Sequence, residues 1–404
     1  MARGKPVVVG VVGSSAAARF HTRNYSRIYD LDVRVKGVAS RTPESARQFA
    51  EVHGLQVAYP SLEAMLDDPE INLVDLCVPN SLHRPLVVRC AEAGKHMVIE
   101  KPLTGYFGPG EADWVADGFS REAMLAGALR NADEMIAAVR QGGVKLCYAE
   151  NWVYAPPIAR AVDLMSKADH TVLRILAEQS HSGTNSDYNM RWVTAGGGSL
   201  FTKGCHPLSA TLYIKRAEGL RKYGRPIRPR SVIADVKNLS RIESFLQEEP
   251  RWIRQGWVDC EDWGMMLLTF EDGSVAQITA GDNTIGGVVN TLSIYSTKLV
   301  IHCNINPNTS LQTFAPRADV WGDVQLREKA ETNAGWQFSN PDEEWMTGYA
   351  QELQDFCEAV ALDREPLCGP DLARDTILVG YAAYLAADEG TRIDLAPWIA
   401  YPVS

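Results

Sequence analysis

The chain has 404 residues, of which 46% are hydrophobic and 22% are charged, and its formal net charge is −10. This length predicts two domains, and an acidic chain without a run of Lys or Arg is a poor partner for DNA or RNA. The longest early apolar run, 7–12, is too short to cross a bilayer and lacks a signal-peptide cleavage site, so no membrane association is expected. Eight cysteines are scattered singly, without a CxxC pair or a Cys/His metal spacing, which favours reduced thiols in a cytoplasmic protein with no metal.

The first 150 residues alternate between short β-branched runs and helical patterns. Strands are predicted at 6–13, 33–40, 73–78, 96–100 and 144–149, and helices at 16–29, 42–53, 85–93 and 124–141. In the second of these helices, Thr42 suits the N-cap, Pro43 the first helical position and Gly54 the C-terminal stop. Such alternation predicts parallel β-α-β units, with helices on both faces of a doubly wound sheet.

The pattern changes after about residue 150. A helix at 158–167 precedes strands predicted at 172–181, 231–239, 263–270, 275–280, 291–296 and 298–303. Glu271-Asp272-Gly273 is a hairpin signal, so this second sheet is expected to be mostly antiparallel. Helices are expected at 342–361 and 371–388, and long loops at 105–120 and 304–340.

A small-residue turn joins the first strand to the first helix. Gly13-Ser14-Ser15-Ala16-Ala17-Ala18 resembles the dinucleotide turn G-x-G-x-x-G/A, with Ser15 at the second glycine. The helix N-terminus would supply amide donors to a pyrophosphate, although any tight strand-to-helix turn favours small residues. Ser40 and Arg41 end the second strand, where an acidic residue would hold a ribose 2′-hydroxyl. A hydroxyl and a guanidinium tolerate a 2′-phosphate, while Arg41 could equally stack on adenine or lie in solvent, so NAD and NADP both stay open.

Three further motifs occur in a characteristic order. They are Val78-Pro79-Asn80 with His83, then Glu100-Lys101-Pro102-Leu103, then Gly196-Gly197-Gly198 leading to Gly204-Cys205-His206. Together they resemble the Gfo/Idh/MocA oxidoreductases along nearly the whole chain. The resemblance implies an N-terminal Rossmann domain over 1–150 and a substrate-binding α+β domain with a large open sheet over 151–404. It also implies a nicotinamide cofactor between the domains and a sugar, polyol or related substrate.

The resemblance assigns roles to two of these residues. Lys101 matches the lysine that contacts substrate and nicotinamide ribose, and His206 matches the acid/base histidine. The family commonly places an aspartate four residues before the histidine, where this chain has Thr202, followed by Lys203. A carboxylate there would raise the basicity of the histidine, whereas a threonine only hydrogen-bonds and a lysine lowers its pKa. Proton transfer is therefore expected to be shared among Lys101, Lys203 and His206.

Other residues near the motifs complete the candidate site. Those expected beside the cofactor are Val78, Pro79, Asn80, His83, Glu100 and Asn151. Those expected beside the substrate are Tyr154, His181, Tyr188, Arg191 and Trp192, with Arg191 available for an anionic group. Each has a structural alternative: a core histidine for His206, a solvated charge for Lys203, and ordinary loop or core packing for the aromatic residues.

Three functions are compatible with these residues. The favoured hypothesis is an NAD(P)-dependent dehydrogenase of a sugar, glycoside or polyol, in which Lys101 polarises the alcohol oxygen and His206 takes its proton. One alternative is a glycoside-cleaving enzyme that oxidises C3 transiently, eliminates the C1 substituent and regenerates its cofactor. The other is a non-catalytic nucleotide-sensing protein. A homo-oligomer, dimer or tetramer, is expected through the second sheet, because exposed sheet faces usually require covering.

Overall fold

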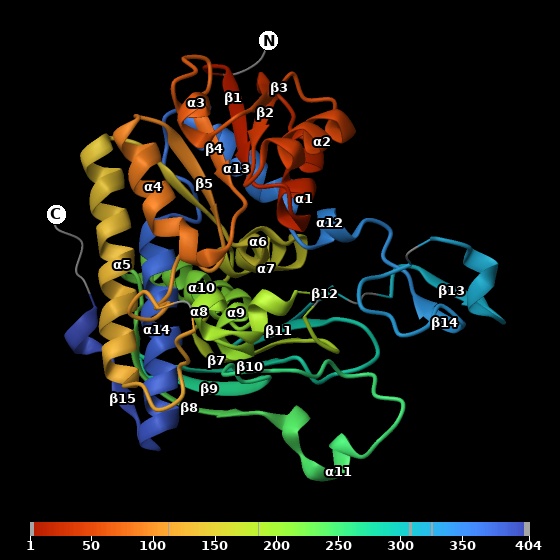
Figure 1. The fold of residues 1–404 in the computed structure, drawn as a ribbon. Coiled ribbons are helices and arrows are strands. Elements are labelled where there is room, and N and C mark those ends of the chain that lie inside the picture. The colour runs from red at the N-terminus through yellow and green to blue at the C-terminus, as the bar shows by residue number, and fades with distance from the viewer. Residues whose placement is uncertain (1–3, 112, 185, 307–308, 325, 400–404) are drawn as a thin grey trace.

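A parallel sheet of six strands forms the N-terminal layer of the molecule (Figure 1). The computed structural model describes residues 4–399 except 112, 185, 307–308 and 325. The strands are β1 (Val7–Val12), β2 (Val33–Ala39), β3 (Val57–Tyr59), β4 (Leu73–Leu76), β5 (His96–Glu100) and β6 (Leu146–Ala149). Their order, β3-β2-β1-β4-β5-β6, is that of the doubly wound Rossmann fold, and it reverses direction beside β1. Every residue of β1 is buried, because helices cover both faces of such a sheet.

The helices of this layer follow the predicted alternation. They are α1 (Ala16–Tyr25), α2 (Pro43–His53), α3 (Leu62–Leu66), α4 (His83–Glu92) and α5 (Arg121–Gly142), with a short 3-10 turn η1 (Asn80–Leu82) before α4. The predicted cap of α2 is confirmed: the Thr42 side chain accepts a hydrogen bond from the Ser45 amide, and Gly54 ends the helix with a φ of 65°. The prediction missed β3 and α3, since three and five residues are too short to show a hydrophobic period.

A mixed sheet of seven strands forms the second layer. The strands are β7 (Val172–Ser180), β8 (Pro229–Lys237), β9 (Trp263–Phe270), β10 (Val275–Gly281), β11 (Val289–Ser296), β12 (Val300–Asn306) and β15 (Ile393–Asp394). In the order β12-β11-β7-β10-β9-β8-β15, all neighbours are antiparallel except β7 and β10. Alternate residues of β9 are buried and only partly buried, which is the pattern of a sheet with one covered face. The expected fold class, a Rossmann sheet followed by a mostly antiparallel sheet, is therefore confirmed.

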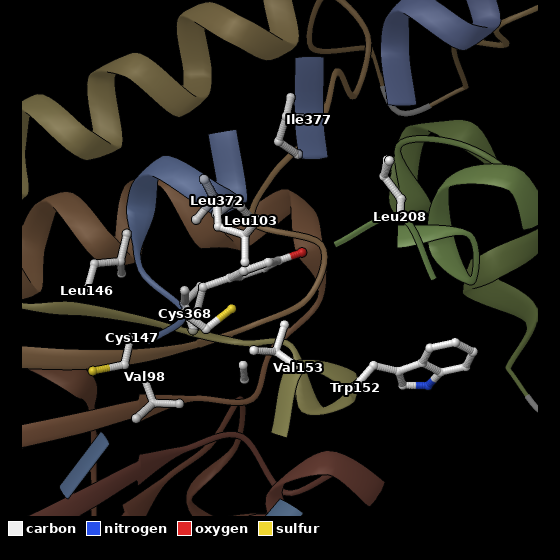
Figure 2. Close-up of a cluster of buried hydrophobic side chains, with 14 of the residues drawn as sticks. Val98, Leu103, Leu146, Cys147, Trp152, Val153, Leu208, Cys368, Leu372 and Ile377 are labelled. Carbon is white, nitrogen blue, oxygen red and sulfur yellow. The ribbon is translucent and has the colours of Figure 1, made fainter. Parts of the chain in front are cut away.

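Helices that follow β6 in the chain pack against the two sheets and against one another. They are α6 (Asn151–Tyr154), α7 (Pro156–Ser166), α10 (Cys205–Tyr223), α13 (Tyr349–Ala361) and α14 (Pro370–Glu389). Of these, α13 packs on α1 and β1, while α14 packs on both α5 and β8. Figure 2 shows the shared apolar cluster, in which Val98 of β5, Leu146 of β6, Val153 of α6 and Leu208 of α10 lie together. The helices α13 and α14 lie beyond residue 150 in the chain but pack on helices of the first layer. The division into two domains at residue 150 therefore stays a prediction.

Two predicted segments were wrong in detail. The stretch 304–340 is not simply a loop, since it contains the antiparallel pair β13 (Gln312–Ala315) and β14 (Gly335–Phe338), which projects from the body (Figure 1). The expected helix 342–361 is divided into α12 (Glu343–Met346) and α13 by Gly348, whose φ is 99°. A Cβ on Gly348 would lie 2.2 Å from the Asn151 carbonyl oxygen, so the approach of α6 requires a glycine here.

The remaining elements are short. They are η2 (Asp187–Met190), α8 (Trp192–Ala195), α9 (Ser199–Thr202), η3 (Leu239–Arg241), α11 (Glu243–Leu246), η4 (Ala318–Trp321) and η5 (Ala396–Trp398). The described residues of 105–120 contain neither helix nor strand, as expected. Over the part of the chain that the structure describes, no helix combines the length and apolar character that crossing a membrane demands.

Candidate active site

The turn after β1 has the geometry that a pyrophosphate needs. Gly13 has a φ of 111°, and a Cβ there would lie 2.1 Å from the Cys77 carbonyl oxygen, so the turn accepts only glycine. Ser15 is the N-cap of α1, and its side chain makes no capping hydrogen bond. Ser15 and Ala16 are exposed, while Ala18 is fully buried against the sheet. The N-terminus of α1 is thus accessible at the strand-order reversal, where this fold binds anionic cofactors.

A cluster of hydroxyls marks the expected position of the adenosine ribose. The Oγ atoms of Ser14 and Ser40 are 2.9 Å apart, and Ser45 Oγ donates to Ser40 Oγ at 2.9 Å. Arg41 is exposed beside them. Neutral hydroxyls and one guanidinium suit either a ribose hydroxyl or a 2′-phosphate, so these residues fit both NAD and NADP.

The loops that follow β4 and β5 are tied together beneath the site. His83 Nδ1 lies 3.0 Å from the Leu103 carbonyl oxygen, and its Nε2 lies 3.0 Å from that of Val78. Asn80 donates to the Ala195 carbonyl oxygen at 3.1 Å. Burial lowers the pKa of this ring, and a neutral imidazole has one N–H, so His83 donates to one of these two carbonyl oxygens and lies against the other. His83 thus lies between the two motif loops and contacts a backbone carbonyl of each.

Lys101 extends from the end of β5 toward the glycine-rich segment. Its Nζ donates to the Thr202 carbonyl oxygen at 3.2 Å, while the Glu100 carboxylate accepts from the Lys101 amide at 3.0 Å. Burial lowers the pKa of the Lys101 amine, because it disfavours the charged form. The electrostatic effect of nearby acidic groups is larger in total, so the pKa is raised; these groups are Cys205, Glu100, Tyr188 and Glu150. Lys101 is therefore an ammonium.

His206 lies in the first turn of α10 and faces a carboxylate that no sequence motif indicated. Its Nδ1 lies 2.5 Å from Glu150 Oε1, and the Glu150 side chain is wholly buried. The Trp152 ring stacks on the imidazole, with centroids 6.1 Å apart. Burial and the nearby Lys101 lower the pKa of His206, and Glu150 opposes this only in part. A neutral imidazole and an ammonium thus meet at one place, which is a combination suited to moving a proton from an alcohol.

The Glu150, Cys205 and His206 side chains also form a cluster of possible metal ligands. Their donor atoms lie within 4.8 Å of one another. Two ligand atoms on a tetrahedral zinc ion, bonded at about 2.0–2.3 Å, are roughly 3.3 Å or more apart. The 2.5 Å separation of His206 Nδ1 from Glu150 Oε1 is instead that of a charge-assisted hydrogen bond.

Lys203 has a carboxylate partner of its own. Its Nζ donates to Asp282 Oδ2 at 2.5 Å, and Ser199 Oγ donates to the same oxygen at 2.5 Å. His181 Nδ1 accepts from the Gly183 amide at 3.0 Å and lies 3.7 Å from Asp282 Oδ1. Burial, with Lys203 and other cations nearby, strongly lowers the pKa of His181, so its ring is neutral. Lys203 is thus the cation of a buried ion pair at the end of β10, which leaves it a weaker candidate for proton transfer than Lys101.

The other expected substrate residues divide into two groups. Tyr188 is 39% exposed. Partial burial raises the pKa of its phenol, and the nearby Lys101 cation opposes that rise. Arg191, on the same segment, is exposed. Trp192 is 1% exposed and donates from Nε1 to the Tyr106 carbonyl oxygen. Tyr154 donates to Asp355 at 2.7 Å and accepts from the Cys368 amide. The structure brings Tyr188 toward the lysine but turns Trp192 and Tyr154 into the core.

Two further predicted residues are engaged elsewhere. The Asn151 amide donates to the Thr347 carbonyl oxygen at 2.8 Å, which joins α6 to the segment before α13. The Thr202 hydroxyl donates to the Gly198 carbonyl oxygen at 2.9 Å, within its own helical turn. Neither side chain faces the site, because each satisfies a buried backbone group instead.

These features are those of a dinucleotide-binding Rossmann sheet joined to a second mixed sheet. Residues 7–118 match the model of the Gfo/Idh/MocA oxidoreductase family, NAD-binding Rossmann fold. The match therefore identifies an NAD-binding Rossmann fold, of the kind found in that family, over residues 7–118.

Individual relatives cover much more of the chain. It is 21% identical to an uncharacterized oxidoreductase, YrbE, of Bacillus subtilis over 90% of this chain and 89% of that protein. It is 26% identical to a levoglucosan dehydrogenase of Pseudarthrobacter phenanthrenivorans over 69% and 68% of the two chains. Among solved structures, GenD2 from gentamicin A biosynthesis in complex with NAD has a TM-score of 0.79 at 23% identity, over 98% of this chain and 99% of that one. A levoglucosan dehydrogenase with NADH has a TM-score of 0.72 at 20% identity, over 97% and 99% of the two chains. At these identities the structural likeness establishes the two-layer fold.

Proposed function

We propose that the protein is an NAD(P)-dependent dehydrogenase that oxidises a secondary alcohol of a sugar, glycoside or polyol. The observation that carries this proposal is the hydrogen bond from Lys101 Nζ to the Thr202 carbonyl oxygen, which joins the end of β5 to the turn before His206. It holds the Lys101 ammonium beside the turn that precedes His206, and Lys101 is near enough to lower the pKa of that imidazole. The names of the levoglucosan dehydrogenase and of GenD2 from gentamicin A biosynthesis support a carbohydrate or glycoside as the substrate class.

The chain's own residues would divide the work as follows. The turn Gly13-Ser14-Ser15-Ala16 would hold the cofactor pyrophosphate and Ser40 with Arg41 the adenosine ribose, while the bound nicotinamide supplies the hydride chemistry. The Lys101 ammonium stabilises negative charge that develops on the alcohol oxygen, and His206 accepts its proton. Tyr188 and Arg191 would line the substrate side. We assign Lys203 to holding Asp282 rather than to proton transfer.

The test is a screen of sugars, polyols and glycosides for cofactor reduction, followed at 340 nm with NAD and with NADP. We expect net reduction by at least one of them. In the Lys101→Ala variant we expect kcat to fall about 10²–10⁴-fold, while the dissociation constant for the dinucleotide changes little. Cleavage of a glycoside without net reduction would instead support the alternative that regenerates its cofactor. Full activity of Lys101→Ala would refute the proposed mechanism.

We also propose a homo-oligomer through the open face of the second sheet and a cytoplasmic location. Alternate residues of β9 on that face are only partly buried, and all eight cysteines are unpaired and buried, as in a reducing compartment. Light scattering that gives a 44.5 kDa particle at working concentration would contradict the oligomer.

A further inference from the structure

A buried carboxylate outside the three sequence motifs contacts the candidate base. We propose that Glu150 is a positioning residue for His206, taking over at this site the task of the carboxylate that the family commonly carries where this chain has Thr202. The inference rests on the proposed function, because it assigns a partner to the base of that reaction.

Glu150 is held in place by its local structure. It is the N-cap of α6, directly after β6, and its Oε1 accepts weakly from the Trp152 amide at 3.4 Å as well as contacting His206. Trp152 is 1% exposed and belongs to the apolar cluster of Figure 2. The close contact of Gly348 with the Asn151 carbonyl oxygen fixes the other side of α6. The carboxylate therefore meets the imidazole from the single residue between β6 and α6, which is held by an element on each side.

Thr202 does not take this role. Its hydroxyl is engaged with Gly198, and its carbonyl oxygen accepts from Lys101. Position 202 thus anchors the lysine, and the acceptor for the imidazole comes from Glu150, 56 residues earlier in the chain than His206. The change of aspartate to threonine consequently leaves the histidine with a carboxylate.

The contacts of Glu150 point to function rather than to stability. Its Oε2 is buried and has no hydrogen-bond partner among the described residues. A buried carboxylate with one oxygen unsatisfied is costly, and an amide or an apolar side chain would fill the space at lower cost. A carboxylate is required here if the residue must stabilise a positive charge that forms on His206.

The chemistry follows from which nitrogen Glu150 engages. With Nδ1–H donating to Glu150, the lone pair of Nε2 is free for substrate. In the oxidation of a secondary alcohol to a carbonyl group, a bound oxidised nicotinamide would take the hydride from carbon, and Nε2 of His206 would take the hydroxyl proton. Glu150 stabilises the resulting imidazolium. Among the described residues, the charged or titratable groups around this ring are Glu150, Lys101, Glu100 and Cys205, and Glu150 makes the hydrogen bond to it.

The first experiment compares Glu150→Gln with Glu218→Gln in the full-length protein. Glu218 is a matched control, because it is also buried and ion-paired, to Lys215 and Lys222, on a part of α10 away from the site. For Glu150→Gln we expect kcat to fall about 10- to 1,000-fold and the acidic limb of kcat/KM to move down by about 1 to 3 pH units, with dinucleotide affinity unchanged. Glu218→Gln should lower thermal stability and leave that limb in place.

Two results would overturn the inference. One is a Glu150→Gln enzyme with wild-type turnover and an unmoved limb. The other is a loss of activity that merely accompanies lost folding or lost cofactor binding, as a structural role would give.

A second measurement needs neither turnover nor a Glu150 variant. Ring-labelled histidine in the wild-type protein reports the tautomer of His206 by nitrogen NMR, with the signal assigned from the spectrum of His206→Gln. We expect the proton on Nδ1, whereas a ring protonated on Nε2 alone would refute the role of Glu150. If no substrate is ever found, the proposed function fails, yet this spectrum still decides between the two tautomers.

Discussion

Two buried histidines contact carboxylates in this molecule, and their charges differ. His21 on α1 has its Nδ1 2.9 Å from Asp75 and its Nε2 3.2 Å from Glu100, all three being largely buried in the Rossmann layer. Burial opposes its charge, but the negative groups around it, chiefly Asp75, outweigh burial and raise the pKa of His21 well above its usual value. His206 has one such partner, Glu150, and a cation nearby, and its pKa is lowered.

The comparison shows that a histidine–carboxylate contact does not by itself make a base. His21 is an imidazolium locked between anions, with no exposed surface, so it supports the fold. His206 is 6% exposed, neutral and beside an ammonium. The count and sign of the surrounding charges distinguish the buried pair at His21 from the proposed catalytic pair at His206.

The largest expected effect is on turnover. Replacing His206→Asn should lower kcat about 10²–10⁴-fold, because it removes the proton acceptor, while the urea midpoint changes little. Steady-state kinetics and urea unfolding, measured on the same preparation, check this contrast. A variant with a lower urea midpoint but a wild-type kcat would show that His206, like His21, has a structural role.

The matching change at the other histidine should act on stability. His21→Asn leaves Asp75 and Glu100 buried without their cation, at a cost of roughly 3–5 kcal/mol in the free energy of unfolding. The midpoint of urea unfolding and hydrogen exchange in α1 measure this loss. An unchanged midpoint would show that His21 is not charged in the folded protein.

The smallest effect is a difference in pH dependence between the two sites. Since the pKa of His206 is lowered from about 6.5, the acidic limb of kcat/KM for oxidation should have its midpoint below pH 6.5. Since the pKa of His21 is raised, its stabilising contribution is fully present below the unfolded-state value and is lost as pH rises through the folded-state value. Activity and stability profiles from pH 5 to 9 test both, and an acidic limb above pH 7 would contradict the assignment of His206.

Local patterns were sufficient for most of the fold. The alternation of strands and helices over the first layer, the caps of α2 and the hairpin between β9 and β10 follow from periodicity and turn chemistry over a few residues. The parallel pairing of β7 with β10 does not, because it joins strands about a hundred residues apart. The pair β13–β14 escaped prediction because its two four-residue strands lack a short connecting turn.

The candidate site residues also divide into those that a local pattern predicts and those that only the tertiary structure reveals. Gly13 was predictable because a tight turn demands that residue type, and Lys101 and His206 were recognised through their motifs. Tyr154 and Trp192 were expected in the site from their position in the chain, but their side chains turn into the core. Glu150 carried one usable signal, an acidic residue at the carboxyl end of a parallel strand, where ligand sites of this fold lie.

The amino-acid sequence alone determined the Rossmann layer, the dinucleotide turn and the presence of a lysine and a histidine in family motifs, because these depend on short-range periods and residue types. Only the tertiary structure decided which carboxylate meets His206, that Lys203 pairs with Asp282, and that His21 is charged while His206 is neutral. Those outcomes depend on burial and on the sum of charges from segments distant in the chain, which no local pattern records.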